Sequence, residues 1–263
     1  YCFFTVVEFL GIDNPVIQIK ISQILQSIFM VSVTYFGFKL IKEIYSHKIA
    51  VYTSLLLCSF YFFPFLSSRT LAEFFCVPFL FSAAYFIQKH HKNKNLNLLL
   101  LAGLLLGISF NVRFQTGAFA IGFALYFILQ KNLKGFIALT IGGIIGISII
   151  QGLLDYFIWG EPFVEFLAYV NYNLANTTTY FDEPWFKYVL LVIPGFLIPP
   201  FGIFLYLGFF KNYKNYAYII LATAFFILFH SYFPNKQERF IIPALPFIVL
   251  VGGAYFFNIY NKF

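Results

Sequence analysis

Residues 135–154 are GFIALTIGGIIGISIIQGLL, a stretch that contains no charged side chain. A helix of about 20 mainly apolar residues is what the hydrocarbon core of a bilayer requires. The apolar residues follow one another without alternating with polar ones, so the stretch does not have the pattern of a membrane β-barrel strand. It therefore predicts a transmembrane α-helix.

Similar apolar runs recur along the whole chain. Of its 263 residues, 61% are hydrophobic, 23% are aromatic and only 10% are charged, whereas a soluble domain has about a quarter charged residues. Lipid must therefore cover most of the surface, and lipid-exposed spans of this kind are helices. We expect an all-α, polytopic integral membrane protein with about nine transmembrane helices. The expected spans are Val16–Leu40, Ile49–Leu66, Phe74–Gln88, Leu96–Phe110, Gly117–Gln130, Gly135–Leu154, Val189–Phe209, Tyr216–Phe233 and Ile241–Tyr260.

No soluble domain or linker separates these runs, so residues 1–263 are predicted to form a single transmembrane domain. The chain begins at Tyr1 rather than Met. We interpret Tyr1–Phe9 as the tail of a preceding span or as a helix in the membrane interface. The chain is therefore expected to be a fragment that lacks an N-terminal span and the first loop on the non-cytoplasmic side.

Threading the chain through nine spans sorts its charges onto two sides. The first, which we call the lysine side, has eleven lysines and a single acid, Glu43, for a net charge of +10. The second, the arginine side, has six basic and nine acidic residues, for a net charge of −3, and the two sides add up to the +7 of the chain. Lysine and arginine are enriched in cytoplasmic loops. The lysine side and the C-terminus are thus predicted to be cytoplasmic, and the arginine side to face a periplasm or an endoplasmic reticulum lumen. This bias explains the basic chain without a nucleic-acid partner.

All three arginines of the chain are on the arginine side, against the usual bias. The planar guanidinium group suits phosphate and carboxylate recognition, whereas lysine acts as a point charge. Arg69 and Arg113 are therefore candidates for binding an anionic group. Arg69 and Glu73 are four residues apart and would share a face on a helix, where they could pair. For either Arg69 or Arg113, a structural ion pair explains the motif almost as well as ligand binding does.

The long segment Asp155–Lys187 contains both tryptophans of the chain, together with tyrosine, asparagine and acidic residues. Aromatic rings that cover C–H faces, with amides and carboxylates that bond hydroxyls, are what a sugar site needs. An aromatic belt at the membrane interface is the alternative. Asn176 also begins the glycosylation sequon Asn-Thr-Thr. The candidates for the sugar or for the loop geometry are Asp155, Trp159, Asn171, Asn176 and Trp185.

Residues 234–240, PNKQERF, lie directly before the last span. Lys236 and Arg239, with Glu238 to orient them, form a compact basic site at the entrance of a helix. A helix N-terminus also favours an anion. This is the most specific motif of the chain.

The motif resembles the His-Lys-Glu-x-Arg-Phe signature of glycosyltransferase family 22. Ser68-Arg69-Thr70-Leu71 is similar to that family's Thr/Ser-Arg-Thr-Leu segment, and Arg113 falls at its next arginine. The segment from Asp155 to Trp185 is similar to the family's long lumenal loop, so the resemblance extends from about residue 60 to residue 247. Asn235 departs from the pattern, because the family usually has His there.

The resemblance implies a mannosyltransferase with the fold of the superfamily C glycosyltransferases. Its donor would be a mannose linked to a polyprenyl phosphate of the dolichol type, and its acceptor a glycan or glycolipid of N-glycan precursor or GPI-anchor synthesis. The transfer would be inverting and would need neither a cofactor nor a metal. The donor phosphate would be bound by Lys236, Arg239, Arg69 and Arg113, with support from Glu73, Glu238 and Asn235. The catalytic base is expected upstream of Tyr1.

The alternative is a transporter or flippase for a lipid-linked anion or sugar. Such a protein would have charged residues within its spans and, in many folds, internal repeats. The charges here are instead at one rim of the spans, which favours an enzyme.

Overall fold

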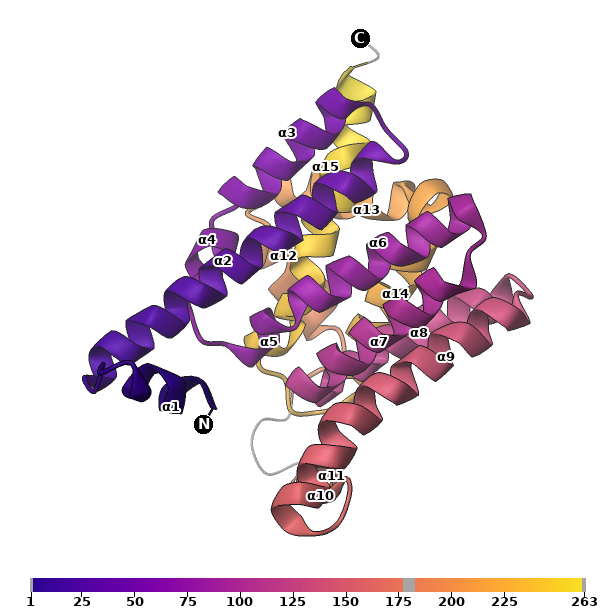
Figure 1. The fold of residues 1–263 in the computed structure, drawn as a ribbon. Helices are drawn as coiled ribbons and strands as arrows, with labels where there is room; N and C mark the ends of the chain where they lie inside the picture. The colour runs from indigo at the N-terminus through magenta and orange to yellow at the C-terminus, as the bar shows by residue number, and fades with distance from the viewer. Residues whose placement is uncertain (1, 177–182, 262–263) are drawn as a thin grey trace.

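The computed structural model describes residues 2–176 and 183–261, and every regular element in those ranges is helical (Figure 1). The first helices are α1 (Cys2–Phe9), α2 (Pro15–Lys42), α3 (His47–Ser59), α4 (Phe62–Ser67), α5 (Ala72–Phe75), α6 (Val77–Asn93), α7 (Leu96–Val112) and α8 (Gly117–Leu129). The later helices are α9 (Leu133–Ile147), α10 (Leu153–Trp159), α11 (Val164–Ala175), α12 (Ile193–Phe196), α13 (Phe201–Lys211), α14 (Tyr213–Tyr232) and α15 (Leu245–Tyr260). Short 3-10 or π segments join them: η1 (Phe114–Thr116), η2 (Ser148–Gly152), η3 (Tyr188–Val192) and η4 (Glu238–Ala244). The all-α prediction is confirmed for these residues.

Four helical stretches in the described ranges are long and apolar enough to cross a membrane: Pro15–Lys42, Leu133–Trp159, Tyr213–Tyr232 and Glu238–Tyr260. A bent pair, Tyr188–Phe196 with Phe201–Lys211, makes a fifth candidate if its two halves form one span. The positions of all nine expected spans are helical, but the helices at the other four are too short for this criterion. Length and composition therefore support four to five candidate spans in the described residues.

Two expected spans are broken within their apolar runs. Ile49–Leu66 is divided between α3 and α4 at Phe60, whose backbone is extended. Val189–Phe209 is divided between α12 and α13, which meet at an angle of 119°. Pro199 and Pro200 follow Ile198, which has a φ of 58°, and prolines supply no N–H donor to a continuing helix. The break therefore has a local cause that mean hydropathy does not register.

The last candidate span, Glu238–Tyr260, is the most buried of the four, with 78% of its apolar window inside the protein. Figure 1 shows α15 passing through the middle of the bundle, and every residue from Leu245 to Ala254 is buried. At Gly252, an added Cβ would lie 2.0 Å from the carbonyl oxygen of Leu205 on α13. This close packing fixes α15, and with it the η4 segment that contains Arg239.

Helices α7 and α9 lie side by side and touch through glycines (Figure 1). A Cβ on Gly103 would lie 2.0 Å from the carbonyl oxygen of Leu139, and one on Gly142 would lie 2.1 Å from that of Leu100. Small residues at such a crossing let two helix backbones approach closely in a membrane. The contact holds the end of α7, where Arg113 is the C-terminal cap.

Loops that the charge pattern assigned to one side meet at one end of the bundle. On the lysine side, Lys92 Nζ lies 3.0 Å from Glu43 Oε2, which joins the end of α6 to the α2–α3 loop. Tyr45 Oη donates to Asn212 Oδ1 at 2.7 Å, which joins that loop to the start of α14. These three loops of the lysine side are thus neighbours in space.

The segment Asp155–Lys187, expected as a long loop, contains α10 and α11 in its described part. Trp159 and Glu165 are therefore on short helices, whereas Glu183 and Trp185 are not. Thr177 and Thr178 of the sequon, and Tyr180, Phe181 and Asp182, lie outside the described residues. Helices α10 and α11 were not predicted, because their hydropathy is mixed.

Candidate active site

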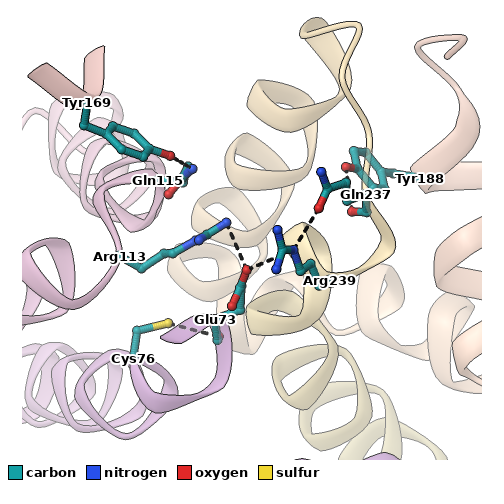
Figure 2. Close-up of polar contacts among 8 residues, drawn as sticks. All are labelled: Glu73, Cys76, Arg113, Gln115, Tyr169, Tyr188, Gln237 and Arg239. Atoms are coloured by element: carbon teal, nitrogen blue, oxygen red, sulfur yellow. Dashed lines mark hydrogen bonds and ion pairs between the residues drawn. The ribbon is translucent and has the colours of Figure 1, made fainter. Parts of the chain in front are cut away.

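A buried carboxylate lies between two arginines from distant parts of the chain (Figure 2). Glu73 Oε1 is 3.1 Å from Arg113 Nη2 and 3.5 Å from Arg239 Nε. Both contacts are ion pairs that do not meet hydrogen-bond geometry. The Glu73 side chain is 4% exposed, Arg113 is 19% exposed and Arg239 is 54% exposed. Arg239 therefore keeps much of its charge available to a ligand.

Each of these three residues lies at a break between helices. Glu73 is in the first turn of α5, after Leu71 has taken an extended backbone. Arg113 ends α7 with a φ of −151°, and η1 follows. Arg239 belongs to η4, just before α15. Helix ends leave polar backbone groups without partners, which makes them natural places to gather charged side chains at one end of the bundle.

Two neighbours hold Arg239 in place. Its Nε donates to Gln237 Oε1 at 2.8 Å, and Tyr188 Oη donates to the Gln237 carbonyl at 3.0 Å. The guanidinium groups of Arg113 and Arg239 both lie over the Phe240 ring, at 5.2 Å and 5.7 Å from its centroid. Cation–π contacts of this kind favour a fixed orientation of the cation.

Gln237 was missed as a site residue. When the family signature is set against Arg239 and Phe240, its Glu position falls on Gln237. Glu238, which the sequence analysis chose as the orienting carboxylate, is 63% exposed and lies 3.7 Å from Lys187. The carboxylate beside Arg239 comes instead from Glu73 on another segment. Counting positions within the signature would have singled out Gln237.

Lys236 is buried and faces the loop that precedes η3. Its Nζ donates to the carbonyl oxygen of Glu183 at 3.0 Å and also to that of Phe233. The backbone N–H of Glu183 donates in turn to the Pro234 carbonyl at 3.2 Å. Lys187 Nζ forms an ion pair with Glu183 Oε1 and donates a hydrogen bond to it at 3.0 Å. The hydrogen bond raises the pKa of Lys187. The described contacts of Lys236 thus join two loops of the arginine side.

Arg69 is exposed, and its guanidinium lies 4.9 Å from the centroid of the Phe65 ring. Its carbonyl oxygen accepts a hydrogen bond from Gln26 Nε2 on α2. The ion pair with Glu73 that helical spacing suggested is not formed. Helix α4 ends at Ser67 and α5 begins at Ala72, so the two residues do not share a helix face, and Glu73 faces Arg113 and Arg239.

An open pocket of about 450 Å³ lies beside this cluster, and we call it the rim pocket. Its walls are mainly aromatic and aliphatic, and its polar residues are in the 237–239 segment. The lining residues are Tyr61, Phe62, Phe65, Leu66, Phe196, Gln237, Glu238, Arg239 and Ile242. The Arg69 guanidinium lies near Phe65, one of the lining rings, but Arg69 does not itself line the pocket. An apolar groove with a guanidinium group in its lining is suited to a lipid that ends in an anion.

Asp155 is buried and serves the geometry of the α10–α11 corner. Its Oδ2 accepts hydrogen bonds from Gln151 Nε2 at 2.8 Å and from the backbone N–H of Glu165, in the first turn of α11, at 3.0 Å. A carboxylate at a helix N-terminus satisfies otherwise unpaired N–H groups. These contacts join α10 to α11, and a role of Asp155 in sugar binding stays a prediction.

The other expected residues of this segment divide into two groups. Trp159 and Trp185 are 58% and 67% exposed, and Asn171 is also exposed. Asn176, in contrast, lines a second pocket, of about 260 Å³, together with Asn235. We call this second cavity the α11 pocket. It also contains His230, a buried histidine at the end of α14, which the sequence analysis left without a role. A histidine at the arginine-side end of an apolar span was the signal that could have found it.

The chain was compared with known proteins. The Alg9-like mannosyltransferase family matches residues 1–262. The Dol-P-Man:Man(7)GlcNAc(2)-PP-Dol alpha-1,6-mannosyltransferase of Saccharomyces cerevisiae is 29% identical over 149 residues, which cover 54% of this chain and 27% of the yeast protein. The chain therefore matches about a quarter of the length of that relative.

Two crystal structures of ArnT from Cupriavidus metallidurans share the fold. The one bound to undecaprenyl phosphate has a TM-score of 0.71 at 14% sequence identity, over 95% of this chain and 47% of that chain. The apo structure has a TM-score of 0.63 at 14% identity, over 91% and 47% of the two chains. At this level of identity the likeness shows the fold alone. The family match extends over almost the whole sequence, and the chain belongs to the Alg9-like mannosyltransferase family.

Proposed function

We propose that this protein transfers mannose from a polyprenyl phosphate of the dolichol type to a glycan or glycolipid acceptor, with inversion, on the non-cytoplasmic side of the membrane. The observation that carries this proposal is the rim pocket, with its apolar walls and with Arg239 in its lining. Family membership supports the sugar and the donor class. The yeast relative is by name a Dol-P-Man-dependent mannosyltransferase, and the ArnT structure of the same fold has undecaprenyl phosphate bound.

In the proposed reaction, an acceptor hydroxyl attacks the anomeric carbon of the mannosyl group as the bond to the lipid phosphate breaks. Negative charge grows on the leaving phosphate, and a cation fixed at that position lowers the barrier without reorganising. Arg239 is the main candidate for that cation because it is the more exposed of the two arginines at Glu73. Arg69, whose guanidinium lies near the Phe65 ring, would add a second positive charge. Arg113 would hold Glu73 in place.

Lys236 would act through the shape of the loop, since its Nζ bonds the carbonyl oxygens of Glu183 and Phe233. The carboxylate of Glu73 faces two arginines, and that of Asp155 accepts two N–H donors. Both carboxylates thus hold neighbouring groups in place, and we assign neither as the base.

The donor class can be tested with the complete protein reconstituted in nanodiscs. Mannose labelled with ¹⁴C is supplied either on polyprenyl phosphate or as GDP-mannose, with mannose-terminated lipid-linked glycans as acceptors. We expect transfer from the lipid phosphate only, because the rim pocket offers an apolar groove to a polyprenyl chain. Transfer from GDP-mannose would contradict the proposal. In sealed proteoliposomes, movement of the lipid-linked sugar from one leaflet to the other without any transfer would instead support the transporter alternative.

The proposed nine-span topology predicts opposite sides for Asn93 and Glu161. Asn93 ends α6 on the lysine side, and Glu161 lies between α10 and α11. After the native cysteines are replaced, a cysteine at position 161 should react with an impermeant maleimide from the non-cytoplasmic side, whereas one at position 93 should react only after permeabilisation. Equal reactivity of the two positions in sealed vesicles would refute this topology.

A further inference from the structure

The α11 pocket, of about 260 Å³, lies between α11, the end of α14 and the segment that precedes η4. Aromatic rings form much of its wall, including those of Tyr169, Phe229 and Phe240. Ligand pockets are commonly at least about 300 Å³, so this one is suited to a single small ring rather than to an extended chain. Helix α11, which has no buried residue of its own, covers one face.

Two buried acceptor atoms belong to residues that line this pocket. His230 Nδ1 lies 2.9 Å from the Phe226 carbonyl oxygen, and because a carbonyl only accepts, this nitrogen has the hydrogen. In the neutral ring, Nε2 is then an acceptor. His230 is 5% exposed, and among the described residues neither its Nε2 nor Asn235 Oδ1 has a hydrogen-bond partner. A buried polar atom without a hydrogen-bond partner costs free energy. These two atoms therefore suit a hydrogen bond to a ligand.

The polar lining also contains a hydroxyl. Gln115 Nε2 donates to Tyr169 Oη (Figure 2), which leaves the hydroxyl hydrogen of Tyr169 available to donate. Acceptor atoms such as His230 Nε2 and Asn235 Oδ1 favour hydroxyl groups and repel anions. Aromatic faces suit the C–H faces of a pyranose ring. The lining therefore matches a neutral sugar and does not match a phosphate.

The α11 pocket lies next to the arginine cluster. Phe240 lines it, and the guanidinium groups of Arg113 and Arg239 lie over the same ring. Arg239 in turn lines the rim pocket. Arg239 and Phe240 thus lie between the two pockets. The α11 pocket suits a neutral ring, and the rim pocket suits a lipid phosphate.

We propose that the α11 pocket binds one neutral hexosyl residue, with His230 Nε2 and Asn235 Oδ1 accepting hydrogen bonds from its hydroxyl groups. The inference rests on the proposed function, which supplies two sources for such a residue. One is the mannosyl group of the donor, and the other is the terminal sugar of the acceptor.

The test uses Asn235→Leu, which removes the acceptor atom at similar length, and Asn235→Asp, which keeps an oxygen there. His230→Phe is the second probe of the same pocket. Thr223→Val is the matched control, because Thr223 Oγ1 is also buried without a described partner on α14 but does not line this pocket. For each variant of the complete protein, the Kd of polyprenyl phosphate mannose, the Kd of sugar-free polyprenyl phosphate and the acceptor KM are measured.

Loss of one hydrogen bond to the sugar should weaken its binding by about tenfold. If the pocket binds the donor sugar, Asn235→Leu and His230→Phe raise the Kd of polyprenyl phosphate mannose and leave that of polyprenyl phosphate unchanged. If it binds the acceptor sugar, they raise only the acceptor KM. In either case, Asn235→Asp recovers part of the loss and Thr223→Val has no effect.

The inference would be overturned if Asn235→Leu and His230→Phe changed neither the Kd of polyprenyl phosphate mannose nor the acceptor KM. It would also be overturned if both variants weakened the binding of sugar-free polyprenyl phosphate by the same factor. The failure of the proposed function would look different. In that case the wild-type protein would transfer no mannose from polyprenyl phosphate mannose, whether or not it bound that lipid.

Discussion

Replacing Arg239 with alanine should lower kcat for mannosyl transfer by about a hundredfold and leave the acceptor KM almost unchanged. The negative charge that grows on the leaving phosphate depends more on a fixed cation than a neutral acceptor does. Removing one well-placed donor from a transition state costs about 3 kcal/mol, which corresponds to about two orders of magnitude in rate. Donor and acceptor concentrations are varied separately in a transfer assay with the complete protein.

The geometry of Arg239 makes the control variants informative. Its Nε is engaged by Gln237 and lies near Glu73, so the rest of the planar guanidinium can face the rim pocket. Arg239→Lys keeps the charge but loses this fork and should recover only part of the rate. Lys92→Ala removes an equal charge from an exposed ion pair on the lysine side and should leave kcat unchanged. An intact kcat in Arg239→Ala, or a defect confined to acceptor binding, would contradict the assignment.

Much of the fold could be predicted because lipid imposes a simple rule on sequence. A charge-free run such as residues 135–154 has few alternatives to a helix, and it forms α9, η2 and the start of α10. The angle at Pro199 and Pro200 was harder, since hydropathy stays high through the break. Helices α10 and α11 were not predicted, because polar and apolar residues are mixed in their sequences.

The restriction of arginines to one side of the membrane was enough to select Arg113 and Arg239 as candidates. It did not predict that both would pair with Glu73. The spacing rule linked Glu73 to Arg69 on the assumption of one continuous helix, and the chain breaks between Ser67 and Ala72. Which carboxylate meets which arginine is decided by the packing of α5, α7 and η4, a long-range property. The charge pattern does not single out residues such as His230 and Gln237. Their roles depend on the atoms that the fold places around them.

Replacing Glu73 with glutamine should lower the free energy of unfolding by about 3 kcal/mol, because removing one partner of a buried ion pair leaves the other charge uncompensated. Arg113, at 19% exposure, bears most of this cost, whereas Arg239 at 54% can be solvated. The measurement is reversible denaturation of the complete protein in mixed micelles. Glu43→Gln, which breaks the exposed pair with Lys92, is the control and should cost less than about 1 kcal/mol.

A double-mutant cycle then tells whether Glu73 acts through Arg113. Arg113→Met removes the buried cation but keeps much of its apolar stem, so Glu73→Gln combined with Arg113→Met leaves no buried charge without a partner. We expect the double variant to be destabilised by less than the two single variants together, by roughly 1–3 kcal/mol. Purely additive losses would mean that the two side chains are neighbours without energetic coupling. A cost for Glu73→Gln no larger than that for Glu43→Gln would remove Glu73 as the residue that holds the arginines. Because kcat is measured on the same variants, a stability loss with unchanged kcat would separate the structural role of the carboxylate from the role of Arg239 in the transfer step.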